Sequence, residues 1–155
     1  MKKKKIIVII LIIAWIAVIW GNSMQPAVVS EGESGTLLEI LSKIFPFLDN
    51  NDAGMYIVRK SAHFTEYAIL GVLLAIQFSM YVRGIFQRLV NPAFTGLAVA
   101  FMDETIQLFV EGRSGQVSDM WIDFAGTVLG VLIALAVVNN KGRGRTRKYR
   151  SYKND

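Results

Sequence analysis

Four long apolar stretches divide the chain and restrict its fold more than any other feature. They are residues 6–20, about 62–82, about 89–110 and about 119–138. A run of about 20 apolar residues is long enough to cross the hydrocarbon core of a bilayer as a helix. The sequence therefore predicts an all-α integral membrane protein with four transmembrane helices in a single membrane domain, residues 1–138.

The first apolar stretch follows a run of lysines at residues 2–5, an arrangement that secretory signal peptides share. No small-residue cleavage site of the usual kind follows it, because the next residues, 21–26, are Gly-Asn-Ser-Met-Gln-Pro. Trp15 and Trp20 are typical of a helix whose end rests at the membrane interface. We therefore expect this helix to be retained as an anchor.

The distribution of lysine and arginine predicts the orientation of the helices. Cytoplasmic segments of membrane proteins carry an excess of these residues. With both termini in the cytoplasm, 13 of the 17 basic residues lie inside, and those left outside are Lys43, Arg59, Lys60 and Arg113. The expected location is the bacterial plasma membrane, with the chain crossing it several times.

The C-terminal residues 139–155 form a basic tail. The net charge of +5 comes largely from this tail and from the N-terminal lysines. Positive charge next to a membrane helix is explained by attraction to anionic lipid, so we predict a disordered cytoplasmic tail and no nucleic-acid partner. Cysteine is absent, which excludes disulfides and thiolate metal sites.

Ionisable side chains are concentrated at one end of the predicted helices. Such groups are costly at membrane depth, so they usually line a cavity, pair with one another or take part in chemistry. In the topology above they lie at the outer ends of the second, third and fourth helices. The candidate catalytic residues are His63, Glu66, Asp103, Glu104, Asp119 and Asp123.

Helical spacing groups these residues into polar stripes, because residues three or four apart share a helix face. The stripes are Arg59, His63 and Glu66 with Tyr67 beside them, then Asp103 with Gln107, and then Asp119 with Asp123. We expect the stripes to turn away from lipid and toward one another. They would then form a polar pocket that opens on the extracytoplasmic side.

The pocket has two interpretations that involve no metal. It is either a structural set of hydrogen-bonded groups that fixes the helices against one another, or a site whose basic residues attract the phosphate or carboxylate of a headgroup. For Arg113, pairing with Glu111 or Asp119 in a tight loop is an equal alternative. The candidate ligand-binding residues are Arg59, Lys60, Tyr67, Gln107 and Arg113.

A divalent metal site is a third interpretation. His63 and Glu66 would offer two ligands from one helix face, and the carboxylates of the other helices would complete the shell. One histidine and no cysteine make zinc less natural. Catalysis would require His63 as a general base oriented by Glu66 or Asp119.

A segment between the first two spans, residues 35–48, is amphipathic. It places Leu37, Leu41, Ile44 and Leu48 at helical spacing but is too short to cross a bilayer. We predict a short interfacial helix in this outer loop. It either lies on the bilayer surface or covers the polar pocket.

Three small or rigid residues carry packing predictions. Gly126 and Gly130, four residues apart, are typical of a close contact between helices, and Gly71 has the same interpretation. Pro92 is expected in the first turn of the third helix, where a missing N–H costs least.

The ordered polar motifs resemble those of VanZ-like membrane proteins. The segment 59–67, Arg-Lys-Ser-Ala-His-Phe-Thr-Glu-Tyr, is similar to the family's RK-x-x-H-x-x-E-Y motif. Asp103-Glu104-x-x-Gln107 followed by Gly112-Arg113, and Asp119-x-x-x-Asp123-x-x-Gly126, resemble its later motifs, and Ser23 with Pro26 resembles its early one. The resemblance covers about residues 6–138.

The resemblance implies a role in the bacterial cell envelope, because the family is named for a protein that gives low-level resistance to the glycopeptide teicoplanin. One expectation is a protein that binds or acts on an outer-leaflet lipid headgroup or lipid-linked wall intermediate through the polar pocket. The alternative is an intramembrane enzyme that uses the His/carboxylate cluster, with or without a metal.

Overall fold

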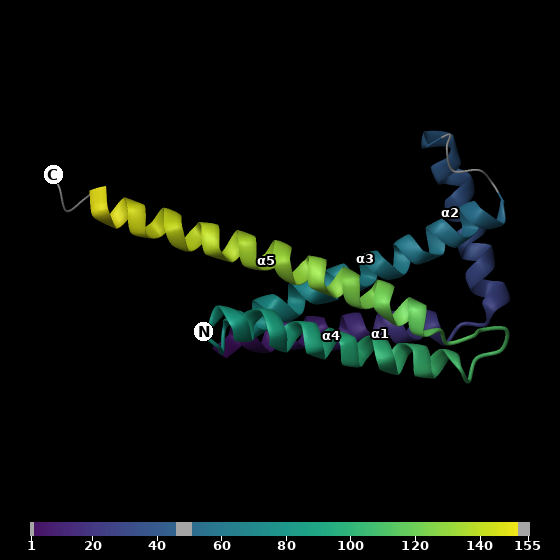
Figure 1. The fold of residues 1–155 in the computed structure, drawn as a ribbon, viewed down its shortest axis with the longest axis horizontal. Coiled ribbons are helices and arrows are strands. Elements are labelled where there is room, and N and C mark those ends of the chain that lie inside the picture. The colour runs from purple at the N-terminus through teal and green to yellow at the C-terminus, as the bar shows by residue number, and fades with distance from the viewer. Residues whose placement is uncertain (1, 46–50, 152–155) are drawn as a thin grey trace.

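The computed structural model describes residues 2–45 and 51–151, with side chains described to residue 138. Within these residues all regular structure is α-helical, which confirms the predicted fold class (Figure 1). The helices are α1 (Lys2–Ser23), α2 (Ala27–Ile44), α3 (Asp52–Ser79), α4 (Ile85–Gln107) and α5 (Val117–Ser151). Four of them are long and apolar enough to cross a membrane: α1, α3, α4 and the part Val117–Val138 of α5.

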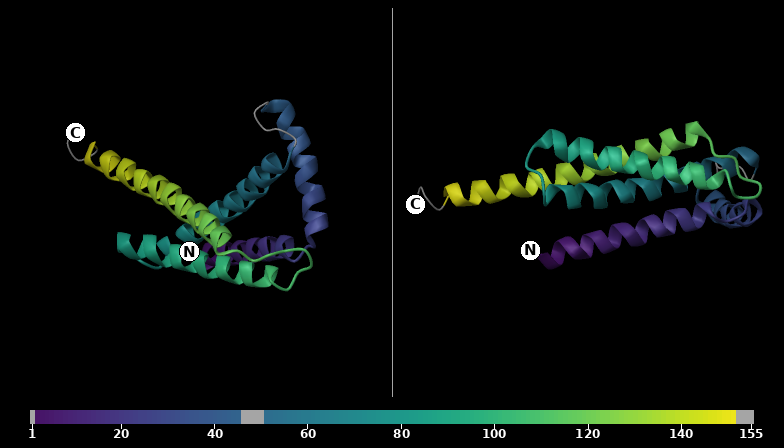
Figure 2. Two further views of the ribbon diagram at one scale, coloured as in Figure 1. Left: turned by 45° about the vertical axis from the view of Figure 1, so that its right-hand side comes forward. Right: turned by 90° about the horizontal axis from the view of Figure 1, so that it is seen from below.

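The four spanning helices lie side by side with alternating direction, and α2 crosses one end of the bundle (Figures 1 and 2). Both chain termini lie toward the opposite end. The outer ends predicted from the sequence therefore meet where α2 lies, at the end of α1, the start of α3, the end of α4 and the start of α5.

The helices α3 and α5 form the most extensive contact in the bundle. Gly126 and Gly130 of α5 permit it, because a Cβ at either position would overlap a backbone carbonyl of α3, that of Phe64 or that of Ala68. Gly71 of α3 meets the α5 backbone in the same way. The predicted glycine contacts are therefore confirmed, and they bring the polar ends of these two helices together.

An apolar core joins α1 to α3 and α4. Ile12 and Ile19 of α1 pack with buried residues of the other two helices, namely Tyr67, Leu70, Leu74, Val99 and Ala100. Many large apolar side chains on the other faces are exposed, Phe94 and Leu132 among them, as expected for surfaces that face lipid tails.

Several helix boundaries differ from those predicted. The helix α3 begins at Asp52, well before the predicted residue 62. The prediction was late because it followed hydropathy, which does not detect a helix in a polar segment. Asn51 caps this helix by accepting a hydrogen bond from the Gly54 N–H at 3.0 Å. Pro92 was predicted in a first turn but lies inside α4, which already starts at Ile85.

The amphipathic helix is present but displaced and longer. It spans Ala27–Ile44 as α2, and Leu38 is its fully buried residue, packed with Val58 and Met55 of α3. Of the predicted stripe, Leu41 packs against this cluster, whereas Leu37 and Ile44 are exposed. Leu48 lies outside the described residues.

The helix α5 continues beyond its apolar part to Ser151 (Figure 1). The side chains of residues 139–155 lie outside the described part of the structure. We therefore keep as predictions that the basic tail is disordered and that it lies in the cytoplasm. The orientation of the bundle in the membrane is a prediction too.

Candidate functional site

Buried polar side chains gather at the end of the bundle that α2 crosses. Among the described side chains, Asp103 and Ser23 have no exposed surface and Asp123 is 1% exposed. Glu104 and Gln107 are also buried. Side chains of this kind in an apolar bundle require partners, because burying an unsatisfied polar or charged group is costly.

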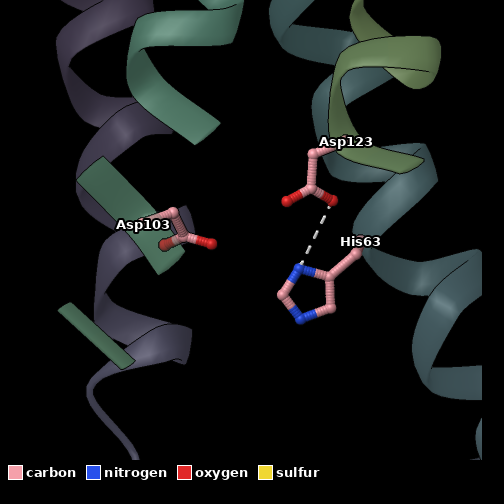
Figure 3. A group of neighbouring side chains, drawn as sticks. All are labelled: His63, Asp103 and Asp123. Atoms are coloured by element: carbon pink, nitrogen blue, oxygen red, sulfur yellow. Dashed lines mark ion pairs between the residues drawn. The ribbon is translucent and has the colours of Figure 1, made fainter. Parts of the chain in front are cut away.

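His63, Asp103 and Asp123 converge from three different helices, α3, α4 and α5 (Figure 3). One ligand atom from each lies within 4.8 Å of those of the other two. The Nδ1 atom of His63 is 3.7 Å from Oδ1 of Asp123. Within the described residues no oxygen of Asp103 or Asp123 accepts a hydrogen bond. We call this cluster, whose side chains could together hold a metal ion, the His63–Asp103–Asp123 triad.

Glu66 is oriented differently from His63, although the two share the α3 sequence motif. Its Oε1 accepts a hydrogen bond from Asn22 Nδ2 at 2.8 Å, and its backbone carbonyl accepts one from Trp15 Nε1 at 2.9 Å. Both donors belong to α1. Glu66 therefore fixes α1 to α3, which is the structural role that the sequence left open.

Glu104 holds the loop between α4 and α5. Its Oε2 accepts a hydrogen bond from the Gln116 backbone N–H at 2.7 Å, and its Oε1 accepts one from Gln107 Nε2 at 3.3 Å. The Gln107 amide also donates to Ser23 Oγ at 3.4 Å. These bonds link the ends of α1 and α4 to the start of α5.

Two ion pairs lie at the mouth of the site. Lys60 of α3 pairs with Asp119 of α5, so Asp119 has a partner outside the triad although it shares a helix face with Asp123. Arg59 pairs with Glu31 of α2 at 3.7 Å. Through this contact α2 covers part of the site.

Arg113 pairs with neither Glu111 nor Asp119. Its Nε donates to the Gln25 carbonyl and its Nη2 to the Asn22 carbonyl, both at 3.1 Å. Burial lowers the pKa of Arg113 from its usual value, and the positive charge of Arg59 lowers that pKa further. The guanidinium is thus held by neutral carbonyls beside a second cation.

Two cavities open at this end of the molecule. The Lys60 cavity, about 440 Å³, is lined by Arg59, Lys60, Arg113 and Asp119 among others. The His63 cavity, about 170 Å³, is lined by His63, Glu66, Arg59 and Arg113 among others. Arg59 and Arg113 line both cavities.

A largely apolar groove of about 420 Å³ adjoins the His63 cavity. It lies between α1, α2 and α3 and contains Trp15, Leu41 and Ile69. The groove and the His63 cavity share four lining residues: Leu37, Val58, Ala62 and Glu66. A polar and an apolar compartment are therefore adjacent.

The structure places all the predicted site residues at one end of the bundle but separates them into groups. Gln107 lines the Lys60 cavity. Tyr67 is fully buried in the core next to Leu70, so it lies behind the cavities. The sequence did not point to Glu31 or Gln116. Glu31 of α2 pairs with Arg59 of α3, and Gln116 contributes its backbone N–H to Glu104. The acidic character of Glu31, in the outer segment between the first two spans, was the one feature of the sequence that could have suggested it as a partner for an arginine.

Comparisons with known proteins agree with the motifs. The sequence model of the VanZ/LLP1 family matches residues 8–138. The searches of curated proteins and of solved structures found no match. The matched region contains the four spanning helices, and the chain is accordingly a multi-pass membrane protein. Since the match covers most of its length, the chain belongs to the VanZ/LLP1 family.

Proposed function

We propose that this protein binds the phosphate headgroup of an outer-leaflet lipid or lipid-linked wall component between Arg59 and Arg113. By holding such a component it contributes to low-level tolerance of teicoplanin-type glycopeptides. The shared chemistry of these ligands is a phosphate on a hydrocarbon chain.

The observation that carries the proposal is the pair of arginines shared by the two cavities. Arg113 donates to two backbone carbonyls, and within the described residues no carboxylate pairs with it. Among the described residues, the ion-pair partner of Arg59 is Glu31, which is partly exposed. Two neighbouring guanidinium groups repel each other, and an anion between them relieves that repulsion. Guanidinium binds phosphate with two parallel hydrogen bonds, which a lone ammonium cannot do.

The adjoining groove supports a lipid over a free anion. A phosphate in the His63 cavity would have its hydrocarbon chain directed past Val58 and Ala62, which line both compartments. Burial of an acyl or prenyl chain stabilises binding by about 0.8 kcal/mol per methylene. The predicted topology puts this end at the outer leaflet, where wall precursors are exposed.

The test measures binding of a short polyprenyl phosphate to the purified full chain in detergent, by calorimetry or native mass spectrometry. Inorganic phosphate and a zwitterionic short-chain phosphatidylcholine are run beside it. We expect the polyprenyl phosphate to bind most tightly. Arg59→Gln should weaken it about tenfold or more, since a hydrogen bond to a charged group contributes about 1.5–3 kcal/mol.

Arg59→Gln is the preferred variant because it leaves the hydrogen bonds at the end of α1 intact. Arg113, in contrast, donates hydrogen bonds to the carbonyls of Asn22 and Gln25, which its substitution would remove. The matched control is Arg83→Gln, an exposed arginine at the other end of the bundle. Unchanged affinity in Arg59→Gln and in Arg113→Gln would refute the headgroup site. Equal affinity for inorganic phosphate would refute the lipid part.

A second candidate function is catalysis on the bound component. The observation that favours it is the position of His63, which lines the cavity and has the Asp123 carboxylate behind it. A histidine backed by a carboxylate is a common general-base arrangement. Conversion of the polyprenyl phosphate by purified protein, absent in His63→Gln, would favour the enzyme, and retained binding without a product would favour the binder.

A further inference from the structure

We propose that His63, Asp103 and Asp123 bind one divalent metal ion of the Zn²⁺ or Mn²⁺ type. This goes beyond headgroup binding and does not depend on it, because the ion would be held by the triad alone.

The first argument is geometry. The three candidate ligand atoms lie within 4.8 Å of one another. Ligands at about 2.1 Å from a tetrahedral Zn²⁺ are about 3.4 Å apart, so modest rotations of the side chains bring them to bonding distance. Figure 3 shows the imidazole and the two carboxylates directed into the same space.

The second argument is the state of the carboxylates. Asp103 is fully buried and Asp123 is 1% exposed. None of their four oxygens has a hydrogen-bond partner at bonding geometry among the described residues, although the donors Ser23, Gln107 and Tyr67 lie beside Asp103. Other acids of the site all have partners: Glu66 has Asn22, Glu104 has Gln116 and Asp119 has Lys60. Two buried carboxylates avoid an unpaired charge either by taking up a proton or by binding a cation. The histidine beside them, His63, adds a ligand that favours a metal ion.

The third argument is ligand chemistry. Two carboxylates balance the charge of a divalent ion, and one imidazole nitrogen favours Zn²⁺ or Mn²⁺ over Ca²⁺, which takes oxygen ligands. Side chains from facing helices build metal sites of this kind in helical bundles. His63 lines the His63 cavity, which gives an ion a path into the site.

The ligand set differs from the one expected from sequence spacing. His63 and Glu66 share a helix face, but Glu66 is bonded to α1 while His63 meets residues of α4 and α5. The difference provides an internal control. Glu66→Gln should leave metal binding intact, whereas Asp103→Asn and Asp123→Asn should remove it.

The test uses the full chain purified in detergent through a tag without histidine, stripped with EDTA and then given Zn²⁺, Mn²⁺ or Mg²⁺ separately. Metal content after desalting should approach one Zn²⁺ or Mn²⁺ per chain, and should fall at least tenfold in Asp103→Asn, Asp123→Asn and His63→Gln. Glu39→Gln, an exposed acid of α2, is the control that should bind normally.

Folding is tested separately from binding. In EDTA, Asp103→Asn should melt at or above the temperature of the parent, because the amide removes a buried carboxylate that has no ion-pair partner among the described residues. Added Zn²⁺ should raise the melting temperature of the parent and of Glu66→Gln, and leave the Asn variants unchanged.

Nuclear magnetic resonance of the histidine ring tests the proposal directly, because His63 is the one histidine of the chain and its signals need no assignment. With ¹⁵N-labelled histidine, the ring nitrogen resonances should shift on addition of one equivalent of Zn²⁺. Unmoved resonances, retention of metal by both Asn variants, or no retained metal in the parent would each overturn the proposal.

Discussion

His63 on α3 and Asp123 on α5 face each other at 3.7 Å between Nδ1 and Oδ1 (Figure 3). The contact joins two helices that glycine residues hold unusually close. The carboxylate next to the imidazole is thus that of Asp123, whereas sequence spacing had pointed to Glu66 or Asp119. The pair therefore ties the chemistry of the site to the packing of α3 on α5.

Loss of this pair should abolish teicoplanin protection. We expect His63→Ala and Asp123→Asn to return the inhibitory concentration in a susceptible host to that of the empty vector. Immunoblots of membranes would verify equal protein levels, and Glu39→Ala should protect like the parent. Full protection from both variants, correctly inserted, would contradict an active role for the pair.

Removal of the Glu31 charge should strengthen headgroup binding. Glu31 competes with a phosphate for Arg59, and a partly exposed ion pair contributes about 0–1 kcal/mol. Glu31→Gln should therefore raise the affinity for polyprenyl phosphate by up to about fivefold, measured by calorimetry. Weaker binding in this variant would mean that Glu31 assists the ligand. Glu39→Gln, on the same helix, serves as the comparison.

Bulk at Gly130 should destabilise the bundle. A Cβ there overlaps the Ala68 carbonyl, so Gly130→Val must push α5 away from α3. Overpacking of this kind costs about 1–3 kcal/mol or more, and thermal unfolding in detergent should show it. Gly32→Ala in α2 is the matched control, since no described atom outside its own stretch of helix lies within 4 Å of its added Cβ. It should be neutral or slightly stabilising. Equal melting temperatures for the two variants would contradict the packing account.

The orientation can be tested with single cysteines, because the chain has none of its own. Ser114→Cys, at an exposed position beside the Lys60 cavity, should react with a membrane-impermeant maleimide in intact cells. Arg83→Cys should react only after the membrane is opened. The reverse pattern would place the polar end in the cytoplasm and exclude an outer-leaflet ligand.

The four spanning helices were predictable because hydropathy alone decides whether a segment can cross a bilayer. Their polar extensions were not, and α3 therefore begins at Asp52, well before the span expected from about residue 62. The start of α2 at Ala27 was missed for the same reason, since its first turns contain Ser30 and Glu31.

The site was predictable as a set of residues but not as a set of contacts. Spacing along one helix groups His63 with Glu66, whereas contacts between helices depend on the rotation and depth of each helix. Those are fixed by packing, here by Gly126 against the Phe64 carbonyl. No pattern within a single helix contains that information, so the convergence of Asp103 and Asp123 on His63 became visible only in three dimensions.

Arg59 and Arg113 belong to both cavities at once, and this has a consequence for stoichiometry. An anion in one cavity neutralises the charges that would attract an anion to the other. The chain should thus saturate with a single phosphate-bearing ligand despite having two openings. A diphosphate, whose two phosphoryl groups can enter both openings together, should outcompete a monophosphate on the same hydrocarbon chain.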